Sequence, residues 1–252
     1  MAVGQAQPAS RADLIRADRF RAALAGETLA FAPIVWEQLP ELVHQPQADW
    51  WRDPTIGQRL IADAAALAMA DAMFVFVAHE TIRSAVSTGQ RGDAAIDALA
   101  QSPEAARGAE LVACLHEVGD HAVIAAVPAP AVVGRELSGD EPASAEDAFS
   151  DLALSYLQAG ADALAVTGDD VDEVRGGVER AAQLSELFAR PVLGVCQHEA
   201  KVRAWAHQGA DLGVVSASGE WPAVASGVVI TPGDVSARWS AERLRAVAGG
   251  RT

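Results

Sequence analysis

Short, continuously apolar segments recur along the chain, and each is followed by a stretch with helical periodicity. Examples are AMFVFVA at 72–78, HAVIAAVP at 121–128 and DALAVTG at 162–168. A strand that is apolar on both faces is typical of a parallel sheet covered by helices. The intervening stretches have the length of crossover helices. This order of segments therefore predicts an α/β fold built from β–α units.

Two helix starts are marked by Asp53-Pro54 and Ser102-Pro103, in which a capping side chain precedes proline in the first turn. No GxGxxG or GxxxxGK[ST] motif follows a strand, which disfavours a nucleotide-binding sheet. The sequence therefore predicts a TIM-type (β/α) barrel with seven recognisable strands, either closed or incomplete. The other predicted strands are 31–36, 191–196, 212–217 and 228–231, and further helices are predicted at about 13–25, 142–158, 170–189, 199–208 and 240–248.

Charge and composition limit the class of protein. The chain has 252 residues, with 19 Lys and Arg against 34 Asp and Glu, for a formal net charge of −15. A protein that binds nucleic acid or an anionic membrane needs a basic surface, so neither partner is expected. No apolar run reaches about 18 residues, and the first residues lack a signal-peptide core. We therefore expect a cytoplasmic protein with a flexible tail at 1–12 and a single barrel domain at 13–252.

Polar residues follow the first two predicted strands at their carboxyl ends. Glu37 follows strand 31–36, and His79 and Glu80 follow strand 72–78. Barrel enzymes carry their active sites at these ends. Histidine titrates near neutral pH, and a neighbouring carboxylate can share acid–base work. We predict that His79, Glu37 and Glu80 are catalytic; the alternative for Glu80 is a place at a helix N-terminus, where the helix dipole favours an acidic residue.

The fifth predicted strand ends in a cysteine and a histidine. Cys196 and His198 are two positions apart, so they share one face if the strand continues that far. A thiolate and an imidazole can bind Zn²⁺, with a carboxylate such as Asp234 or Glu37 completing the site. We predict a metal site of Cys196, His198 and Asp234. The alternative is a small buried cysteine beside a solvated histidine.

Seven segments occur in an order and spacing that carry a family resemblance. They include DPTIGQRLIADAAALAMADAMFVF at 53–76, YLQAGADALAVTGDD at 156–170 and PVLGVCQH at 191–198, and the others are 18–36, 102–115, 127–139 and 208–218. In these segments the chain resembles the uroporphyrinogen decarboxylase superfamily. The resemblance implies a (β/α) barrel. The superfamily contains haem-pathway decarboxylases and zinc-dependent methyltransferases that move methyl groups between corrinoids and thiols.

Several positions depart from the patterns of this superfamily. Its decarboxylases carry RQAGR after the first strand, where this chain has EQLPE beginning at Glu37, and an aspartate after the second, where it has Ala78. Without these groups to hold a polycarboxylate porphyrinogen, we expect no turnover of uroporphyrinogen. The methyltransferases carry an HxC pair on the fifth strand, whose cysteine matches Cys196 and whose histidine is replaced by Gly194. Asp234 stands where a second cysteine is expected.

The resemblance therefore implies a diverged enzyme, with methyl transfer at a metal-assisted site, involving a thiol or a corrinoid, as its first expected function. Zinc and a corrinoid methyl carrier are the implied cofactors, and a small-molecule substrate and a corrinoid protein are the implied partners. One alternative is a decarboxylase or other lyase acting on a small carboxylic acid, which a basic cluster at the mouth from Arg83, Arg135 or Arg203 would favour. Another is a non-catalytic barrel that binds a small molecule.

The segment 37–52 carries large apolar residues without a helical or strand period, among them Leu39, Leu42, Trp50 and Trp51. Such a surface is expected to be covered. A second copy of the chain is the favoured cover, because twofold dimers are the commonest oligomers. We predict a homodimer with Trp50 or Trp51 near the interface. The competing interpretation is that the segment folds over its own barrel.

Overall fold

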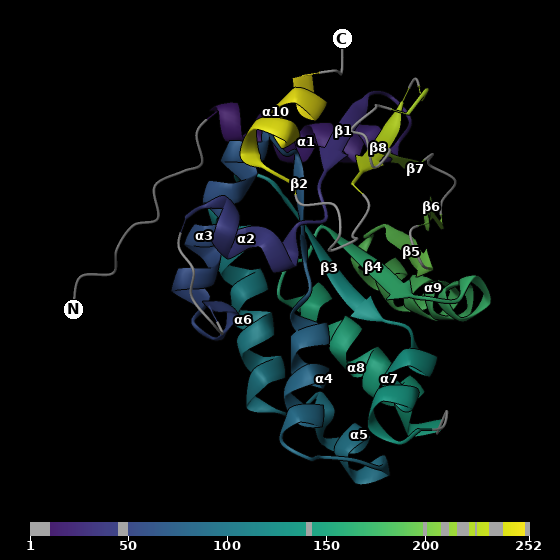
Figure 1. Ribbon diagram of the computed structural model, residues 1–252. Helices are drawn as coiled ribbons and strands as arrows, with labels where there is room; N and C mark the ends of the chain where they lie inside the picture. Colours follow the sequence, from purple (N-terminus) through teal and green to yellow (C-terminus); the bar gives the residue numbers. More distant parts are fainter. Residues whose placement is uncertain are drawn as a thin grey trace.

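Strands and helices alternate along most of the chain (Figure 1). The structure, a computed structural model, describes residues 11–44, 50–139, 143–198, 201–207, 212–215, 222–224, 226–231 and 239–249. The strands are β1 (Leu29–Ala32), β2 (Ala72–Val75), β3 (Ala122–Pro128), β4 (Ala163–Gly168), β5 (Val192–His198), β6 (Lys201–Ala206), β7 (Leu212–Val214) and β8 (Gly227–Ile230). The α-helices are α1 (Arg11–Leu24), α2 (Leu39–Leu42), α3 (Pro54–Ala68), α4 (Val77–Ser87), α5 (Asp93–Leu99), α6 (Pro103–Val118), α7 (Pro130–Leu137), α8 (Ala143–Gln158), α9 (Val171–Ser185) and α10 (Ala241–Gly249). Three short 3-10 helices are η1 (Trp36–Gln38), η2 (Trp50–Arg52) and η3 (Glu186–Phe188).

The predicted caps of α3 and α6 are confirmed. The carboxylate of Asp53 accepts hydrogen bonds from the backbone N–H groups of Thr55 at 3.0 Å and Ile56 at 3.2 Å. The hydroxyl of Ser102 accepts from the N–H of Ala105 at 3.1 Å. In both helices proline occupies the first turn, where its missing N–H costs no hydrogen bond.

The described strands form two sheets. One has the order β1-β8-β7 and is parallel, and the other has the order β2-β3-β4-β5-β6 and is parallel except for its last pair. β1 lies beside β2 and β6 beside β7, so the strands follow one another in a ring-like order. Among the described residues, however, no backbone ladder joins the two sheets at these junctions. The predicted α/β class is confirmed, and the closed barrel is not shown.

An aspartate side chain bridges the junction between β1 and β2. Asp71, which directly precedes β2, accepts the backbone N–H of Phe31 on its carboxylate at 2.8 Å. The backbone N–H of Asp71 in turn donates to the carbonyl of Phe31, also at 2.8 Å. The carboxylate takes the place that a backbone carbonyl has in a regular ladder, and it is only 2% exposed. The sheets are thus joined here through a side chain.

The helix predicted at 199–208 is wrong, because β6 lies in this segment and makes an eighth strand. β6 runs antiparallel to β5, with Gly194 opposite Trp205. The apolar residues Val202, Ala204 and Ala206 alternate along it and pack on one core cluster, as a period of two requires. A Cβ atom at Gly194 would lie 2.4 Å from the Trp205 indole, so glycine is what lets this ring pack against β5.

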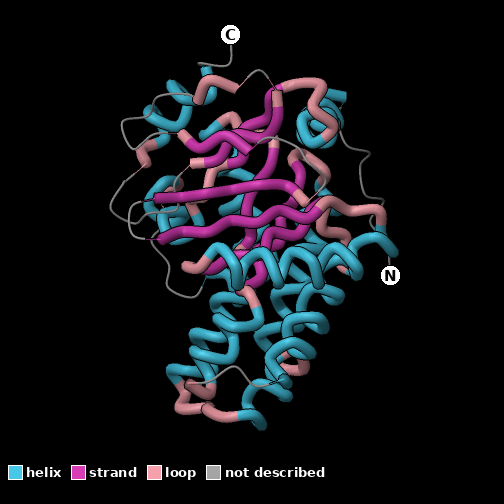
Figure 2. The backbone as a smooth tube through the Cα atoms, turned by 90° about the vertical axis from the view of Figure 1, so that its right-hand side faces the viewer, coloured by secondary structure: helices cyan, strands magenta, loops and turns pink. Residues whose placement is uncertain are grey.

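Two apolar clusters stabilise the fold. The inner one contains Phe20 of α1 together with buried residues from six of the described strands, among them Ala72, Ala165 and Val228. The outer one fills the space between the strands and the helices. Figures 1 and 2 show the strands gathered in one half of the molecule, with α4 to α8 forming a group of helices that extends beyond them. No described helix has the length and apolar character needed to cross a membrane.

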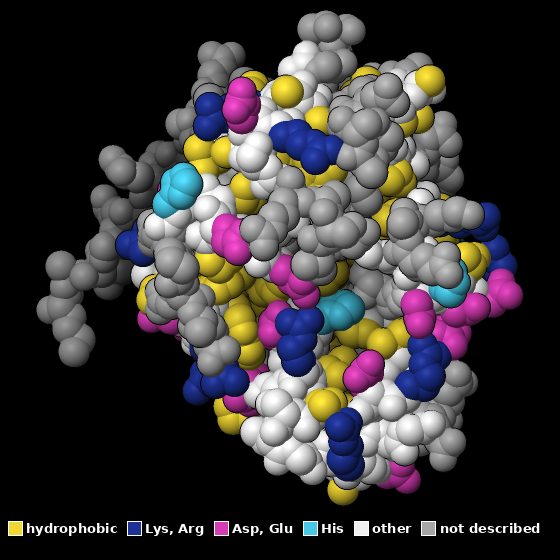
Figure 3. Space-filling model, in the orientation of Figure 1, with side chains coloured by type: hydrophobic (Ala, Val, Ile, Leu, Met, Phe, Trp, Pro, Cys, Tyr) yellow, Lys and Arg dark blue, Asp and Glu magenta, His cyan; other side chains and the backbone are white. Residues whose placement is uncertain are grey.

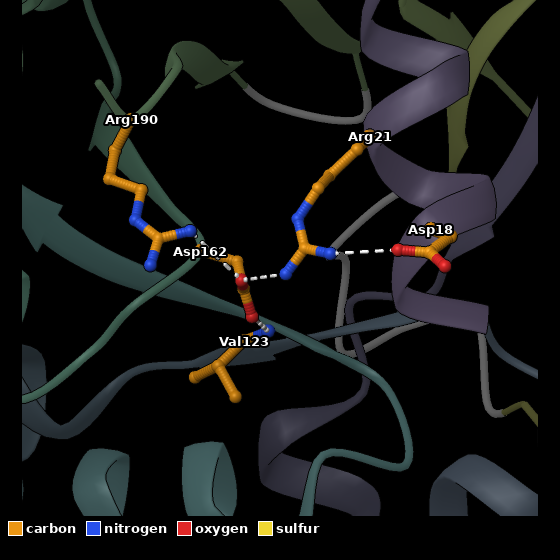
Figure 4. A network of polar contacts seen from close by, with 5 residues as sticks. All are labelled: Asp18, Arg21, Val123, Asp162 and Arg190. Atoms are coloured by element: carbon orange, nitrogen blue, oxygen red, sulfur yellow. Dashed lines mark hydrogen bonds and ion pairs between the residues drawn. The ribbon is translucent and has the colours of Figure 1, made fainter. Parts of the chain in front are cut away.

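Buried Asp162 organises the end of the sheet at which β4 begins (Figure 4). One carboxylate oxygen accepts from Arg21 of α1 at 3.0 Å and from Arg190 at 3.2 Å. The other accepts from the backbone N–H of Val123 in β3 at 3.0 Å. Asp18 also binds Arg21, at 2.9 Å. Because α1 also contacts β1, β2, β3 and β8, this network holds the helix against the sheet.

The large apolar residues of 37–52 are covered, as expected, and the chain itself covers those that the structure describes. Trp50 and Trp51 are 6% and 4% exposed, and η2 packs against α3 and α6. Leu39 and Leu42 are buried as well. The ring centroids of Trp36 and Trp50 are 4.5 Å apart. These residues therefore give no reason to place an interface here, and the homodimer stays a prediction.

Candidate functional site

A pocket with a volume of about 380 Å³ lies where the carboxyl ends of β1, β2, β4 and β5 come together with α4 and α7. This is the end of the sheet at which the sequence predicted a site. In Figure 3, basic, acidic and histidine side chains meet near the centre of the molecule, above the group of helices. The pocket is lined by apolar residues Ile34, Val35, Trp36, Phe76, Val132 and Val195, ionisable residues Glu37, His79, Glu80, Arg83, Arg135, Glu136 and Asp169, and Gln38, Thr167, Gly168 and Gln197.

The imidazole of His79 is held in the pocket by the side chain of Thr167. Nε2 of His79, in the first turn of α4, lies 2.7 Å from Oγ1 of Thr167 at the end of β4. That hydroxyl donates to the carbonyl of Val127 in β3 at 3.3 Å. A hydroxyl has one proton to donate, and when Thr167 gives it to Val127 its oxygen accepts from Nε2–H. Nδ1 is then the ring nitrogen with the free lone pair.

His79 is neutral at pH 7. Burial is the main cause that lowers its pKa to about 4, and the positive charge of Arg83 adds to this effect. Desolvation disfavours the imidazolium form, and a neighbouring cation disfavours it further. The Phe76 ring, with its centroid 5.2 Å from that of His79, forms part of these apolar surroundings.

The two predicted catalytic carboxylates share one arginine. Arg83 donates to Glu80 at 3.0 Å and to Glu37 at 3.2 Å. Glu80 also accepts from the indole N–H of Trp36 at 3.1 Å. Glu80 is mostly shielded from solvent, whereas Glu37 and Arg83 are exposed. The structure thus brings Glu37, His79 and Glu80 to one pocket, with both carboxylates already bound to a cation.

A second arginine is held on another wall of the pocket. Arg135 of α7 donates to Asp169 at 2.9 Å and also binds Glu173 of α9. Asp170 points elsewhere, because its carboxylate caps α9 by accepting from the N–H groups of Asp172 and Glu173. These backbone hydrogen bonds, more than the charges of Arg135 and His198, lower the pKa of Asp170. Each arginine of the pocket therefore joins two carboxylates.

The predicted metal ligands on β5 lie away from the pocket. Cys196 and His198 share a face, as their spacing predicted, but Val195 and Gln197 are the β5 residues that line the pocket. Cys196 belongs to the outer apolar cluster, and His198 is exposed. Asp234 lies outside the described residues. Arg203, which the sequence offered as a basic group for the mouth, pairs across from Cys196 and does not line the pocket.

Zinc is the metal that the family resemblance implies, and the described residues do not fit it. Burial raises the pKa of the Cys196 thiol, and the charges of Asp170 and Asp169 raise it further. A cysteine binds zinc as a thiolate, so burial, which is the main cause of the raised pKa, opposes binding. Among the described residues, no group of three or more His, Cys, Asp or Glu side chains is placed to hold a metal ion. The site with Asp234 stays a prediction.

Thr167 is the functional residue that sequence reasoning missed. It lies in the apolar run DALAVTG, on the same face of β4 as Ala163 and Ala165, which pack in the inner cluster. A hydroxyl at the carboxyl end of that face was the available signal.

Neither protein-family models nor curated proteins give a significant match to the chain.

Proposed function

We propose that the protein is an enzyme that transfers protons on a small organic molecule bound in the pocket, with His79 as the acid–base group. The observation that carries the proposal is the 2.7 Å contact between Nε2 of His79 and Oγ1 of Thr167. It fixes a neutral imidazole at the carboxyl ends of the strands, where enzymes of related architecture place their chemistry.

In the proposed step, Nδ1 of His79 takes a proton from a C–H or O–H group of the substrate. The products of the step are an imidazolium and a substrate anion, and the same ring later returns the proton. An imidazole with a pKa of about 4 is a weak base, so the substrate anion needs stabilisation. The charge of Arg83 reaches the imidazole even though Glu37 and Glu80 bind this arginine, so it favours negative charge that develops beside His79 without a direct ion pair. The reaction class is a lyase or an isomerase.

Methyl transfer, with zinc and a corrinoid as cofactors and a corrinoid protein as partner, is supported by the family resemblance alone. It needs a thiolate at the reaction site, and Cys196 faces the outer cluster. A lyase for a small carboxylic acid needs a basic cluster, and both pocket arginines are matched by carboxylates. Proton transfer at His79 needs neither feature. The remaining alternative is a non-catalytic binding protein, and measuring the exchange of ligand hydrogen with solvent distinguishes it from an enzyme.

We also infer that the two sheets are arcs of one opened (β/α) barrel. This inference is supported by the ring-like order of the strands, in which β1 lies beside β2 and β6 beside β7. It is supported as well by the inner cluster, which takes side chains from both sheets, such as Ala30 and Ala72.

The test is exchange of substrate hydrogen with solvent. The protein is incubated in D₂O with a mixture of small metabolites, and deuterium incorporation is followed by mass spectrometry. We expect incorporation into one compound with the native chain, and a rate about 100-fold lower with His79→Gln. Binding of the same compound without exchange would identify a non-catalytic binding protein. Equal exchange by both proteins would exclude His79 as the acid–base group.

A further inference from the structure

We propose that the ligand of this pocket is a small organic cation, such as a protonated amine with an apolar body. The inference rests on the proposed function only for the choice of site, since it concerns what the pocket binds. It begins from the charges of the lining. Four carboxylates, Glu37, Glu80, Glu136 and Asp169, face two guanidinium groups, and His79 is neutral.

The two arginines offer little to an anionic ligand. Arg83 is shared by Glu37 and Glu80, and Arg135 is shared by Asp169 and Glu173. A ligand carboxylate would have to displace one of these carboxylates, which would then lie in the pocket without its cation. An ammonium group instead adds positive charge to a lining in which carboxylates outnumber guanidinium groups. The net charge of −15 on the chain also favours the approach of cations.

The two walls that carry an arginine differ in charge. At one, Arg83 binds Glu37 and Glu80. At the other, Arg135 binds Asp169 and Glu173, and Glu136 adds a third carboxylate. Arg83 lowers the pKa of His79 through its charge, so the potential beside the imidazole is unfavourable for an ammonium. Glu136, in the last turn of α7, and Asp169, at the end of β4, are lining carboxylates contributed by other elements. We therefore place the ammonium at Glu136 and Asp169. The rest of the ligand then extends toward His79.

The remainder of the pocket fits an apolar body. Ile34, Val35, Phe76 and Val195 contribute apolar side chains from the ends of β1, β2 and β5, and Val132 adds another from α7. A volume of about 380 Å³ is within the range of pockets for small ligands. Carboxylates next to an apolar cavity bind an amine with both a charged and an apolar part. The cavity and the charge balance thus point to the same class of ligand.

Three probes that differ mainly in charge test the proposal: cyclohexylamine, cyclohexanol and cyclohexanecarboxylate. Their binding is measured by calorimetry at pH 7 and low salt. We expect the amine to bind about tenfold more tightly than the carboxylate, with the alcohol between them. Added salt should reduce the difference. Equal or tighter binding of the carboxylate, or no binding of any probe, would overturn the proposal.

Variants locate the charge that matters. Glu136→Gln should reduce the preference for the amine about threefold, whereas Glu117→Gln, which removes an exposed carboxylate of α6 that does not line the pocket, should leave it unchanged. An equal effect of the two substitutions would count against the proposal. His79→Gln should keep the preference for the amine. Amine binding without hydrogen exchange would therefore refute only the proposed function, and exchange confined to anionic compounds would refute only the inference made here.

Discussion

The hydroxyl of Thr167 lies 2.7 Å from Nε2 of His79 and donates its own proton to Val127. β4 thereby holds one ring nitrogen of a histidine that α4 carries, and we predict that this contact selects the tautomer. Thr167→Val should remove the bond and let both tautomers of His79 form, whereas Thr167→Ser should keep the Nε2–H tautomer. The measurement is the ¹⁵N chemical shift of the two ring nitrogens at pH 7. Identical nitrogen shifts in the native chain and in Thr167→Val would show that Thr167 does not select the tautomer.

The pKa of His79 predicts a pH-dependent contribution to stability. Its value falls from 6.5 to about 4 on folding, so the unfolded chain binds the proton more readily between these values. The contribution is fully present above about pH 6.5 and is lost as the pH falls to about 4. It amounts to at most about 3 kcal/mol. Urea unfolding at pH 7 and pH 4.5 should show a larger loss for the native chain than for His79→Gln, and parallel losses would refute this assignment.

Asp162 should be the most sensitive charged residue of the fold, because it is buried and binds two arginines and a backbone N–H. Asp162→Ala should lower the free energy of unfolding by about 3 kcal/mol, since it leaves these donors without their acceptor. The control is Arg21→Gln, which removes a half-exposed partner and should cost about 1 kcal/mol or less. Urea denaturation decides the matter, and a similar loss for both variants would mean that Asp162 is no centre of the network.

Gly194 and Trp205 should be energetically coupled. Gly194→Ala places a methyl group 2.4 Å from the indole and should cost about 1–3 kcal/mol. In a Trp205→Ala background the same change should cost much less, because the space is then open. A double-mutant cycle by urea denaturation measures the coupling. If the losses of stability from the two substitutions were additive, the Trp205 indole would not pack against Gly194.

Trp50 should matter for folding and not for association. Its burial against the chain itself predicts that Trp50→Ala lowers the free energy of unfolding by about 3–5 kcal/mol. Light scattering at micromolar concentration gives the mass of the native assembly, for which one chain contributes 26.2 kDa. If Trp50→Ala left the stability unchanged but altered the mass of the assembly, Trp50 would belong to an interface between chains.

The sequence predicted seven of the described strands because their apolar runs are nearly continuous. The sequence did not predict β6, because this strand follows β5 almost at once and a helix was expected between successive strands. The alternation of Val202, Ala204 and Ala206 was the available signal. The antiparallel pairing of β5 with β6 interrupts the alternation of strands and helices on which the prediction of a regular barrel depended.

The pocket was predicted better than the metal site, for a physical reason. His79 and Glu80 begin a helix just after β2, so their place at the end of the sheet follows from the order of elements. The orientation of Cys196 depends on which face of β5 turns inward. That strand is apolar on both faces, with Leu193 and Val195 inside and Val192 outside, and such a strand carries no marker of its inner face.

The pairing of β1 with β8 has a consequence for how this chain acquires its structure during synthesis. The backbone N–H of Ile34, just after β1, donates to the hydroxyl of Thr231, a residue 197 positions later. While the chain is emerging from the ribosome, β1 must therefore wait, without its partner strand, until the segment around Thr231 has been made. Contacts so distant in sequence slow folding, and an unpaired strand invites aggregation. Early truncation of the C-terminus should accordingly affect the first strand as severely as the last.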